Sequence, residues 1–237
     1  MNVVLQKGRY RARQSTTSVD IANAQALRAR AFGCDDRDAL DARCTHILVE
    51  DTSTSKLVCC FRMLLLDASQ VDQSYSGQFY ELSALKRFEG PLVEMGRFCS
   101  DPDLSADPDI LRMAWGAMTA FVDAHGVELM FGCSSFTGTD PAPYAVSFAM
   151  LNKKHLAPKL LRPMRKASDV VCFETALPRV QETRAMPSLL RTYLMMGGWV
   201  SDHAVIDHQM NTMHVFTGVE VCKIPEARKR LLRAVVG

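Results

Sequence analysis

At Pro91-Leu92-Val93-Glu94-Met95-Gly96-Arg97-Phe98-Cys99, an apolar run of strand length carries one acid and one base. Its apolar side chains suit a sheet, whereas Glu94 and Arg97 suit a buried strand only where each has a partner. A spacing of three places the two charges on opposite faces of a regular strand, and a bulge brings both toward one side. Because Gly96 suits a bulge, the stretch predicts a kinked strand with a carboxylate and a guanidinium at its edge.

This acid–base pair allows two interpretations. In the first, the carboxylate takes a proton from an amine, and the guanidinium holds an anion or orients the carboxylate. In the second, Glu94 and Arg97 form a structural ion pair at the end of a strand. The nine residues do not decide between them, so the rest of the chain has to be considered.

The composition is that of an ordinary globular protein. The chain has 237 residues, of which 48% are hydrophobic and 23% are charged, and this length suits one large domain or two small ones. We find no internal repeat, linker or low-complexity segment, and we therefore expect a single domain over residues 1–237. The formal net charge of +2 indicates no nucleic-acid partner, so the distribution of charge matters more than its sum.

The cysteines and histidines do not form a recognisable metal or redox motif. None of the eight cysteines belongs to a C-x-x-C pair, and most lie in apolar surroundings, which is typical of reduced core residues in a cytosolic protein. The six histidines are scattered, and ligand pairs at metal spacing are missing. We therefore expect no zinc site and no other metal site.

The sequence shows no sign of a membrane-spanning or secretory segment. The N-terminal apolar run is limited to residues 3–5 and is followed at once by cations. No apolar segment approaches the roughly 18 residues that span a bilayer. We expect a cytoplasmic protein whose membrane contact is at most peripheral.

Hydrophobic periodicity predicts an alternation of strands and helices. Residues 73–88 are interpreted as loop with a short helix, and residues 134–140 as a Ser/Thr/Gly loop. The order of elements predicts one α/β domain with a mixed sheet. The predicted strands are 9–13, 45–49, 57–66, 91–99, 127–133, 170–174, 199–206 and 213–221. The predicted helices are 18–32, with Ser18 or Asp20 as N-cap, 107–125, 141–155, 187–196 and 224–236.

Two clusters of charge stand out. Arg62 interrupts an apolar strand pattern, and the four aspartates of the polar segment 33–43 are candidate partners for it, although an acid cluster of this kind is also typical of a solvated loop. Arg28 lies in the last turns of its predicted helix, where a cation suits the helix dipole. Residues 141–168 contain no acid but six cations, which form either a solvated face or a docking surface for an acidic protein or an anionic membrane. These cations are Lys153, Lys154, Lys159, Arg162, Arg165 and Lys166.

An ordered set of short segments extends over roughly residues 9–225. It consists of LRARAF (27–32), DALD (38–41), CTHILV (44–49), FRML (61–64), ELS (81–83), EMGR (94–97), FGCSSF (131–136) and LLRTYLMMGGWV (189–200). No single segment is specific, but together they resemble the ornithine N-acyltransferase family, which begins ornithine-lipid synthesis. The resemblance implies a GNAT-type acyltransferase fold, with a central, strongly twisted mixed sheet flanked by helices.

The acyl-homoserine-lactone synthases are also similar over the first half of the chain. They share the helix arginine and phenylalanine, the D-x-x-D pair, the strand arginine and an E-x-x-R motif. The FGCSSF and LMMGGWV segments fit the ornithine acyltransferases better. A lactone synthase therefore remains the alternative relative.

The expected acyl donor is an acyl carrier protein. Ordinary members of this fold bind coenzyme A through an R/Q-x-x-G-x-G/A loop before a helix. The corresponding stretch here, residues 97–109, has no such loop and is acidic, which is poor for a nucleotide diphosphate. The resemblance likewise implies a donor in which the 4′-phosphopantetheine of acyl carrier protein holds the chain as a thioester, with no tightly bound cofactor. The basic residues within 153–166 then gain an acidic docking partner.

The resemblance implies transfer of a 3-hydroxyacyl chain to the α-amino group of L-ornithine, which gives a lyso-ornithine lipid. Direct attack needs no nucleophilic residue, so we interpret Cys99 and Cys133 as packing residues. By analogy, Glu94 is the general base, Arg97 orients it or holds an anion, and a backbone N–H at the kink stabilises the oxyanion. A lipid-like product implies transient contact with the inner leaflet of the membrane.

The remaining site residues are assigned by position. The expected amino-acid pocket contains charged groups that meet the ammonium and carboxylate groups of the substrate, although the same groups also suit an internal salt-bridge network. These residues are Arg28, Phe32, Asp38, Asp41 and Arg62. Ser134 and Ser135, which end the predicted strand, suit either contact with the pantetheine arm or a capping loop.

Three alternatives stay open. The acceptor can be glutamine or another amino acid, because the sequence does not reveal the acid that would bind a δ-ammonium. The product can be an acyl-homoserine lactone. In a different class, the chain is a non-catalytic carrier-protein or membrane-binding module that retains the fold.

Overall fold

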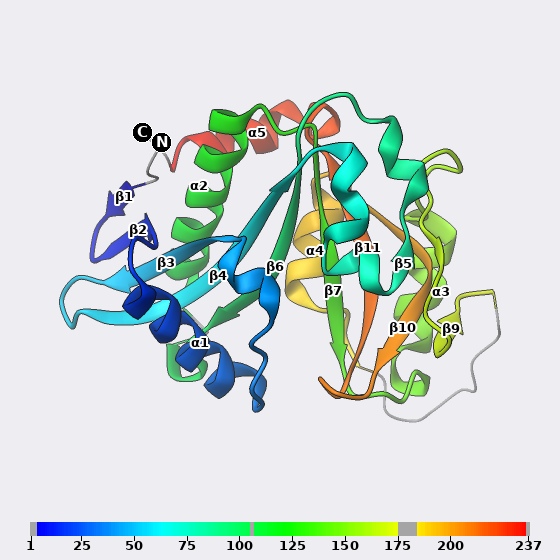
Figure 1. The fold of residues 1–237 in the computed structure, drawn as a ribbon, viewed down its shortest axis with the longest axis horizontal. Helices are drawn as coiled ribbons and strands as arrows, with labels where there is room; N and C mark the ends of the chain where they lie inside the picture. The colour runs from blue at the N-terminus through cyan, green and yellow to red at the C-terminus, as the bar shows by residue number, and fades with distance from the viewer. Residues whose placement is uncertain (1–3, 105–106, 175–183, 236–237) are drawn as a thin grey trace. The chain divides into compact units, whose positions relative to one another are not determined.

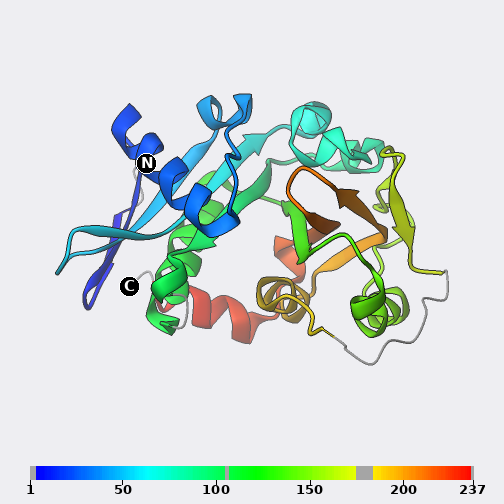
Figure 2. The ribbon, with the colours of Figure 1, turned by 90° about the horizontal axis from the view of Figure 1, so that it is seen from below.

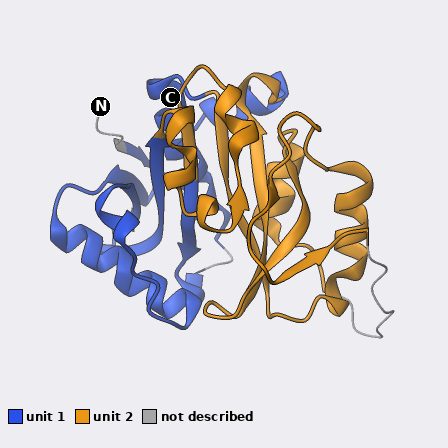
Figure 3. Ribbon diagram, turned by 45° about the vertical axis from the view of Figure 1, so that its right-hand side comes forward, with its two compact units in different colours: residues 1–65, 95–127, 225–237 blue, residues 66–94, 128–224 orange. Residues whose placement is uncertain are grey.

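The computed structural model describes residues 4–104, 107–174 and 184–235 (Figure 1). The chain forms two compact units that are interwoven in sequence, as the two colours of Figure 3 show. Unit 1 comprises residues 1–65, 95–127 and 225–237, and unit 2 comprises residues 66–94 and 128–224. In the described ranges, no helix combines the length and apolarity that crossing a bilayer requires.

The sheet of unit 1 begins with a hairpin that the sequence did not reveal. Strands β1 (Val4–Lys7) and β2 (Tyr10–Gln14) pair antiparallel, as do β2 with β3 (Thr45–Asp51) and β3 with β4 (Lys56–Leu66). Strand β6 (Leu92–Ser100) follows β4 in the strand order, and its residues 95–100 belong to unit 1. The predicted strands at 9–13, 45–49 and 57–66 are therefore present, with small shifts at their ends.

Helix α1 (Ser18–Phe32) covers the unit 1 sheet. Its N-cap is Thr17, rather than the predicted Ser18 or Asp20, because the Thr17 side chain accepts from the N–H of Asp20 and completes a capping box. Gly33 ends the helix at φ 73°, a left-handed conformation that favours glycine. Buried side chains of α1 pack with three residues of β3, β4 and β6. This cluster contains Ala24, Leu27, Leu48, Cys60 and Cys99.

Two further helices belong to unit 1. Helix α2 (Pro108–His125) begins after the N-cap Asp107, with proline in its first turn, and ends at Gly126. It packs against β1, β2 and β3, and α5 (Glu226–Arg233) packs against it, as Figure 2 shows from below. The predicted helix at 107–125 is confirmed, whereas the observed C-terminal helix α5 is shorter than the predicted range 224–236.

The sheet of unit 2 contains both parallel and antiparallel pairs. Residues Leu92–Glu94 of β6 run parallel to β7 (Leu129–Thr137), and the register is Leu92 to Leu129 and Glu94 to Phe131. The next strands in order, all antiparallel, are β11 (Thr212–Glu220), β10 (Trp199–Asp207) and β9 (Val170–Cys172). The predicted mixed sheet is thus present (Figure 1).

The two faces of the unit 2 sheet have different covers. Helices α3 (Ala145–Lys154) and α4 (Ser188–Met195) pack on one face, over a core that includes Phe136, Phe148, Leu190, Val200 and Met213. On the other face, the ring of Tyr80 contacts the rings of His203, His214 and Phe216. Tyr80 belongs to β5 (Tyr80–Glu81), which pairs with β8 (Met164–Arg165) in a small ribbon that the sequence did not predict.

Short 3-10 helices connect these elements. In unit 1 they are Ala39–Ala42 and Pro102–Leu104. In unit 2 they are Ala68–Gln73, Ser76–Gln78, Ser83–Arg87, Ala142–Tyr144 and Val221–Lys223. The segment 73–88 is therefore built from several short turns, where the sequence predicted loop and one helix.

Candidate active site

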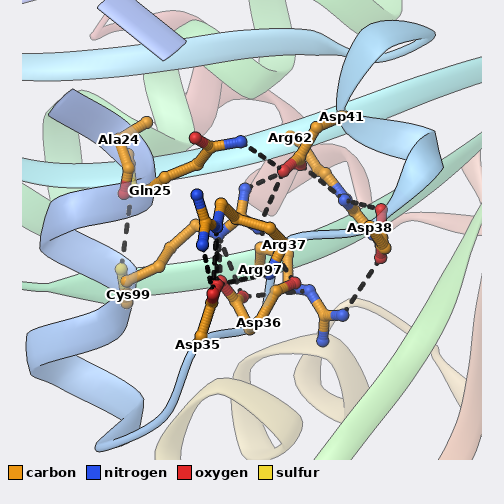
Figure 4. Close-up of polar contacts among 12 residues, drawn as sticks. Ala24, Gln25, Asp35, Asp36, Arg37, Asp38, Asp41, Arg62, Arg97 and Cys99 are labelled. Carbon is orange, nitrogen blue, oxygen red and sulfur yellow. Dashed lines mark hydrogen bonds and ion pairs between the residues drawn. The ribbon is translucent and has the colours of Figure 1, made fainter. Parts of the chain in front are cut away.

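Unit 1 contains a buried network of six charged side chains. One arginine comes from each of α1, β4 and β6, and the three aspartates come from the segment between α1 and β3. Figure 4 shows most of these residues converging in one place. The network consists of Arg28, Arg62, Arg97, Asp36, Asp38 and Asp41. The sequence predicted aspartate partners for Arg62 and left a salt-bridge network that includes Arg28 as an alternative, and it did not single out Asp36.

Arg28 lies at the most buried end of this network. Its Nε donates to both carboxylate oxygens of Asp36 at 2.9 Å, and its Nη1 donates to Asp41 Oδ1 at 2.7 Å. Burial opposes the charge of Arg28, but the hydrogen bonds to Asp41 and Asp36 more than offset it, so its pKa is raised. Arg28 is thus a buried ion-pair residue, and contact with the helix dipole is not needed to explain it.

Arg62 links two of the aspartates. Its Nη1 donates to Asp38 Oδ1 and to Asp41 Oδ1, each at 2.6 Å, and its Nη2 donates to Asp38 Oδ2 at 2.6 Å. Burial acts to raise the pKa of Asp41, but hydrogen bonds from Arg28, Gln25 and Arg62 outweigh it, and the pKa is lowered well below its usual range. Both carboxylates therefore stay charged at neutral pH.

Arg97 joins the same network from the kinked strand. Its Nη2 donates to Asp38 Oδ2 at 3.1 Å, and its Nε lies 3.1 Å from Asp36 Oδ2. The sequence predicted the kink at Gly96, but the left-handed residue is Arg97, with φ 56°. A non-glycine residue in this conformation costs about 1–3 kcal/mol, which the ion pairs of Arg97 help to offset. Strain of this kind is typical of functional positions.

The network is balanced in charge and is mostly closed to solvent. Among its six side chains Asp38 is the most accessible, with 25% of its side chain exposed. Phe32 lies on α1 and packs against the apolar cluster described above. Arg28 and Asp41 therefore have the geometry of the internal salt-bridge alternative, and Asp38 is the member that a ligand can reach most easily.

Glu94 occupies a buried position in unit 2 and organises a turn. Its Oε2 accepts from the N–H of Tyr75 at 2.8 Å, and its Oε1 accepts from both the N–H and the hydroxyl of Ser76 at 2.6 Å. These donors lie at the start of the 3-10 helix Ser76–Gln78, where a negative charge is favourable. The sequence did not identify Tyr75 and Ser76 as partners, because the segment has no periodic pattern.

The serines of the FGCSSF segment lie within β7 rather than in the predicted loop. Ser134 is buried and accepts from the hydroxyl of Thr217 at 2.9 Å, whereas Ser135 is exposed. Both residues pair with β11, which extends the strand to Thr137. The Sγ of Cys133 lies 3.5 Å from the hydroxyl of Ser76, so this strand reaches the turn that Glu94 holds.

A histidine that the sequence did not indicate, His203, lies on the face of the unit 2 sheet that Tyr80 contacts. His203 is fully buried, and its Nδ1 lies 2.7 Å from Asp202 Oδ1. Burial lowers the pKa of His203, although Asp202 acts in the opposite direction, so the ring is neutral at pH 7. No hydrogen-bond partner of its Nε2 lies among the described residues. An isolated histidine carries no spacing signal, which explains why the sequence did not reveal it.

The six cations of the predicted docking surface have different surroundings. Arg162 donates to the carbonyl of Ala157 at 3.1 Å, and Lys166 donates to the carbonyl of Gly77 at 2.6 Å. The other four are exposed and form no ion pair with an acid in the described ranges. These four are Lys153, Lys154, Lys159 and Arg165. In the same ranges, no three His, Cys, Asp or Glu residues gather as metal ligands.

Comparisons with known proteins agree on one kind of chemistry. Residues 22–115 match the acetyltransferase (GNAT) domain family. An L-ornithine N(alpha)-acyltransferase of Rhodobacter capsulatus is 35% identical over 187 residues, which cover 75% of this chain and 71% of the relative. An L-ornithine N(alpha)-acyltransferase of Rhizobium meliloti is 29% identical, with coverage of 90% and 80%.

Solved structures show the same fold at low sequence identity. FeeM, an N-acyl amino acid synthase from uncultured soil microbes, superposes with a TM-score of 0.55 at 11% identity, over 91% of this chain and 93% of FeeM. The loading GNATL domain of CurA from Lyngbya majuscula superposes with a TM-score of 0.51 at 12% identity, over 91% of this chain and 99% of that domain. At these identities the likeness concerns the fold alone.

Proposed function

Because the chain belongs to the L-ornithine Nα-acyltransferase family, we propose that it transfers a 3-hydroxyacyl chain from acyl carrier protein to the α-amino group of L-ornithine. The predicted GNAT-type fold and N-acyltransferase activity are both confirmed. The assignment of ornithine as the acceptor rests on the match to relatives named for ornithine, which covers 75% of this chain. The product of the proposed reaction is a lyso-ornithine lipid.

The proposed chemistry is direct aminolysis of a thioester. The α-ammonium loses a proton, the amine attacks the carbonyl, and the C–N bond forms as the C–S bond breaks and the pantetheine thiol leaves with a proton. We assign Glu94 as the base, directly or through a water molecule, and we assign Arg97 to an anionic group of a substrate. A backbone N–H near the kink of β6 donates to the oxyanion.

We assign the amino acid to the accessible part of the charged network. Asp38 is the most exposed of the six side chains, and a carboxylate suits an ammonium group of ornithine. Arg62 holds Asp38 directly, and Asp41 links Arg62 to Arg28. Phe32 packs on the apolar cluster of the same unit. For the pantetheine arm, the exposed hydroxyl of Ser135 is better placed than the buried hydroxyl of Ser134.

The choice of acyl carrier protein as the acyl donor rests on the distribution of charged residues along the chain. Residues 97–109 lack the glycine loop that holds a nucleotide diphosphate, and residues 141–168 offer cations to an acidic carrier protein. We assign docking to the cations of residues 153–166, above all to Lys153 and Lys154, which lie in the last turn of α3.

The double variant Lys153→Glu/Lys154→Glu tests this docking surface. We expect its affinity for holo acyl carrier protein to fall by about tenfold at low salt, and by less at high salt, because the attraction is electrostatic. The measurement is isothermal titration calorimetry at two salt concentrations. The matched control is Lys7→Glu/Lys56→Glu, which changes the charge equally at exposed lysines of unit 1. Equal losses in both double variants would assign the effect to net charge alone.

A product assay by mass spectrometry tests the reaction as a whole. The protein receives a 3-hydroxyacyl carrier protein, or the matching acyl coenzyme A, with ornithine, lysine, glutamine or S-adenosylmethionine in separate reactions. We expect an acyl-ornithine amide when the acyl carrier protein is the donor, and no product when acyl coenzyme A replaces it. An acyl-glutamine product would change the acceptor, and a lactone from S-adenosylmethionine would change the reaction. Carrier binding without any product would favour a non-catalytic binding module.

A further inference from the structure

Helix α3 of unit 2 has a buried face and an opposite face that is exposed. Ser147, Phe148 and Leu151 are buried, and the two apolar residues belong to the core that α3 covers. By contrast, Val146 is 69% exposed and Met150 is 38% exposed. Because residues four apart lie above one another on a helix, Val146 and Met150 form one row along the exposed face.

A second row lies beside the first and is also exposed. It consists of Ala149 and Lys153, while Lys154 continues the first row beyond Met150. The exposed side chains are therefore apolar in the first part of the helix and cationic in its last turn. Residues 145–154 contain no acid, so the face carries no negative charge of its own.

The apolar part of this face suits contact with another helix. Rows of residues four apart are the ridges by which helices pack on one another. Ala149 lies beside the row of Val146 and Met150, and its small side chain lets a second backbone approach closely. Neighbouring apolar side chains are unfavourable in water unless a partner covers them, and one row is the width that a single helix covers.

The charge of the face indicates an acidic partner. Lys153 and Lys154 are exposed, and within the described ranges neither forms an ion pair with an acid. An acidic helix with its own apolar side chains matches both parts of the face. A second copy of this chain, placed symmetrically on the same face, would bring the same cations and no acid.

We propose that Val146, Ala149 and Met150 form the apolar centre of the surface that binds acyl carrier protein, and that an acidic helix of the carrier packs along α3. This inference rests on the proposed function, in which the carrier protein is the acyl donor. It adds an apolar contact to a docking surface that the cations alone would make wholly electrostatic. Lys153 and Lys154 meet acids at one end of this contact and so fix the direction of the bound helix.

The test is isothermal titration calorimetry with holo acyl carrier protein at low and at high salt. The variant is Val146→Gln/Met150→Gln, because glutamine is polar and is also a good helix former. We expect its dissociation constant to rise by about tenfold or more at both salt concentrations, because salt does not screen apolar contacts. The loss of affinity in Lys153→Glu/Lys154→Glu, in contrast, shrinks as the salt concentration rises.

A matched control and a measurement of mass complete the test. Val19→Gln/Leu231→Gln replaces two exposed apolar side chains on helices of unit 1, and we expect it to bind the carrier as the unaltered chain does. Unchanged affinity in Val146→Gln/Met150→Gln, with α3 intact by circular dichroism, would overturn the proposal, as would a loss that disappears at high salt. So would an unaltered protein that sediments as a dimer and becomes a monomer in this variant, since a second copy would then cover the face.

The same measurements separate this inference from the assignment of the donor. If the unaltered protein binds no carrier protein and makes product from acyl coenzyme A, the donor assignment fails, and the inference fails with it. If the unaltered protein binds the carrier and makes an acyl-ornithine amide, while Val146→Gln/Met150→Gln binds equally well, the proposed function stands and only the apolar contact is wrong.

Discussion

Replacing Glu94 by glutamine will lower turnover by about 100-fold or more, because a positioned general base contributes 10²–10⁴-fold to a proton transfer. The Michaelis constant for the acyl carrier protein should change little, since the base acts on the amine and not on the donor. Steady-state kinetics with a thiol-release assay measure both quantities. The acid limb of the pH profile of kcat/KM should disappear in Glu94→Gln if the carboxylate accepts the proton.

The anchoring role of Glu94 requires a second variant. The amide group of Glu94→Gln would face one of the N–H donors of Tyr75 and Ser76, so this variant also disturbs the turn. Ser76→Ala is the matched control, because it removes the hydroxyl donor at 2.6 Å and leaves the carboxylate and both N–H groups in place. Equal losses of turnover and of thermal stability in the two variants would assign Glu94 to anchoring rather than to catalysis.

Replacing Arg28 by methionine should lower the free energy of unfolding by about 3–5 kcal/mol, because it leaves Asp36 and Asp41 buried without their main partner. Urea unfolding at pH 7 measures this as a lower midpoint. The control is Arg37→Met, which removes an exposed arginine paired with Asp35 in the neighbouring turn. We expect the midpoint of the control to be unchanged.

The same experiment separates the two interpretations of the charged network. If Arg28 holds the network together, stability falls and the residual activity follows the folded fraction. If Arg28 instead binds substrate, Arg28→Met keeps the urea midpoint and raises the Michaelis constant for the amino acid. The second outcome would contradict the structural role that its two ion pairs indicate.

Elements with a strong local pattern were predictable. The strand at 91–99 and the helix at 107–125 have the correct periodicity, and capping residues fix the ends of the helix. The aspartate partners of Arg62 were also predictable, because a charge in an apolar run must be neutralised nearby. In these cases a local rule and the tertiary structure require the same residues.

Features that depend on tertiary contacts were not predictable. The turn at Tyr75 and Ser76 is fixed by Glu94, some twenty residues further along the chain, and its own sequence has no period. The kink lies at Arg97 and not at the neighbouring Gly96. The left-handed conformation is more easily adopted by glycine, and the ion pairs of Arg97 help to offset its cost there. Ser134 and Ser135 were interpreted as loop because they are polar, but β11 supplies the pairing that extends their strand.

The interwoven order of the two units has a consequence for how the protein is made. The chain passes from one unit to the other four times, and α5, which packs against α2, belongs to unit 1 although it lies at residues 226–233. A ribosome releases the chain from its N-terminus, so unit 2 has all its residues before unit 1 does. The side of α2 that packs against α5 therefore stays uncovered during synthesis until residues 226–233 have left the ribosome.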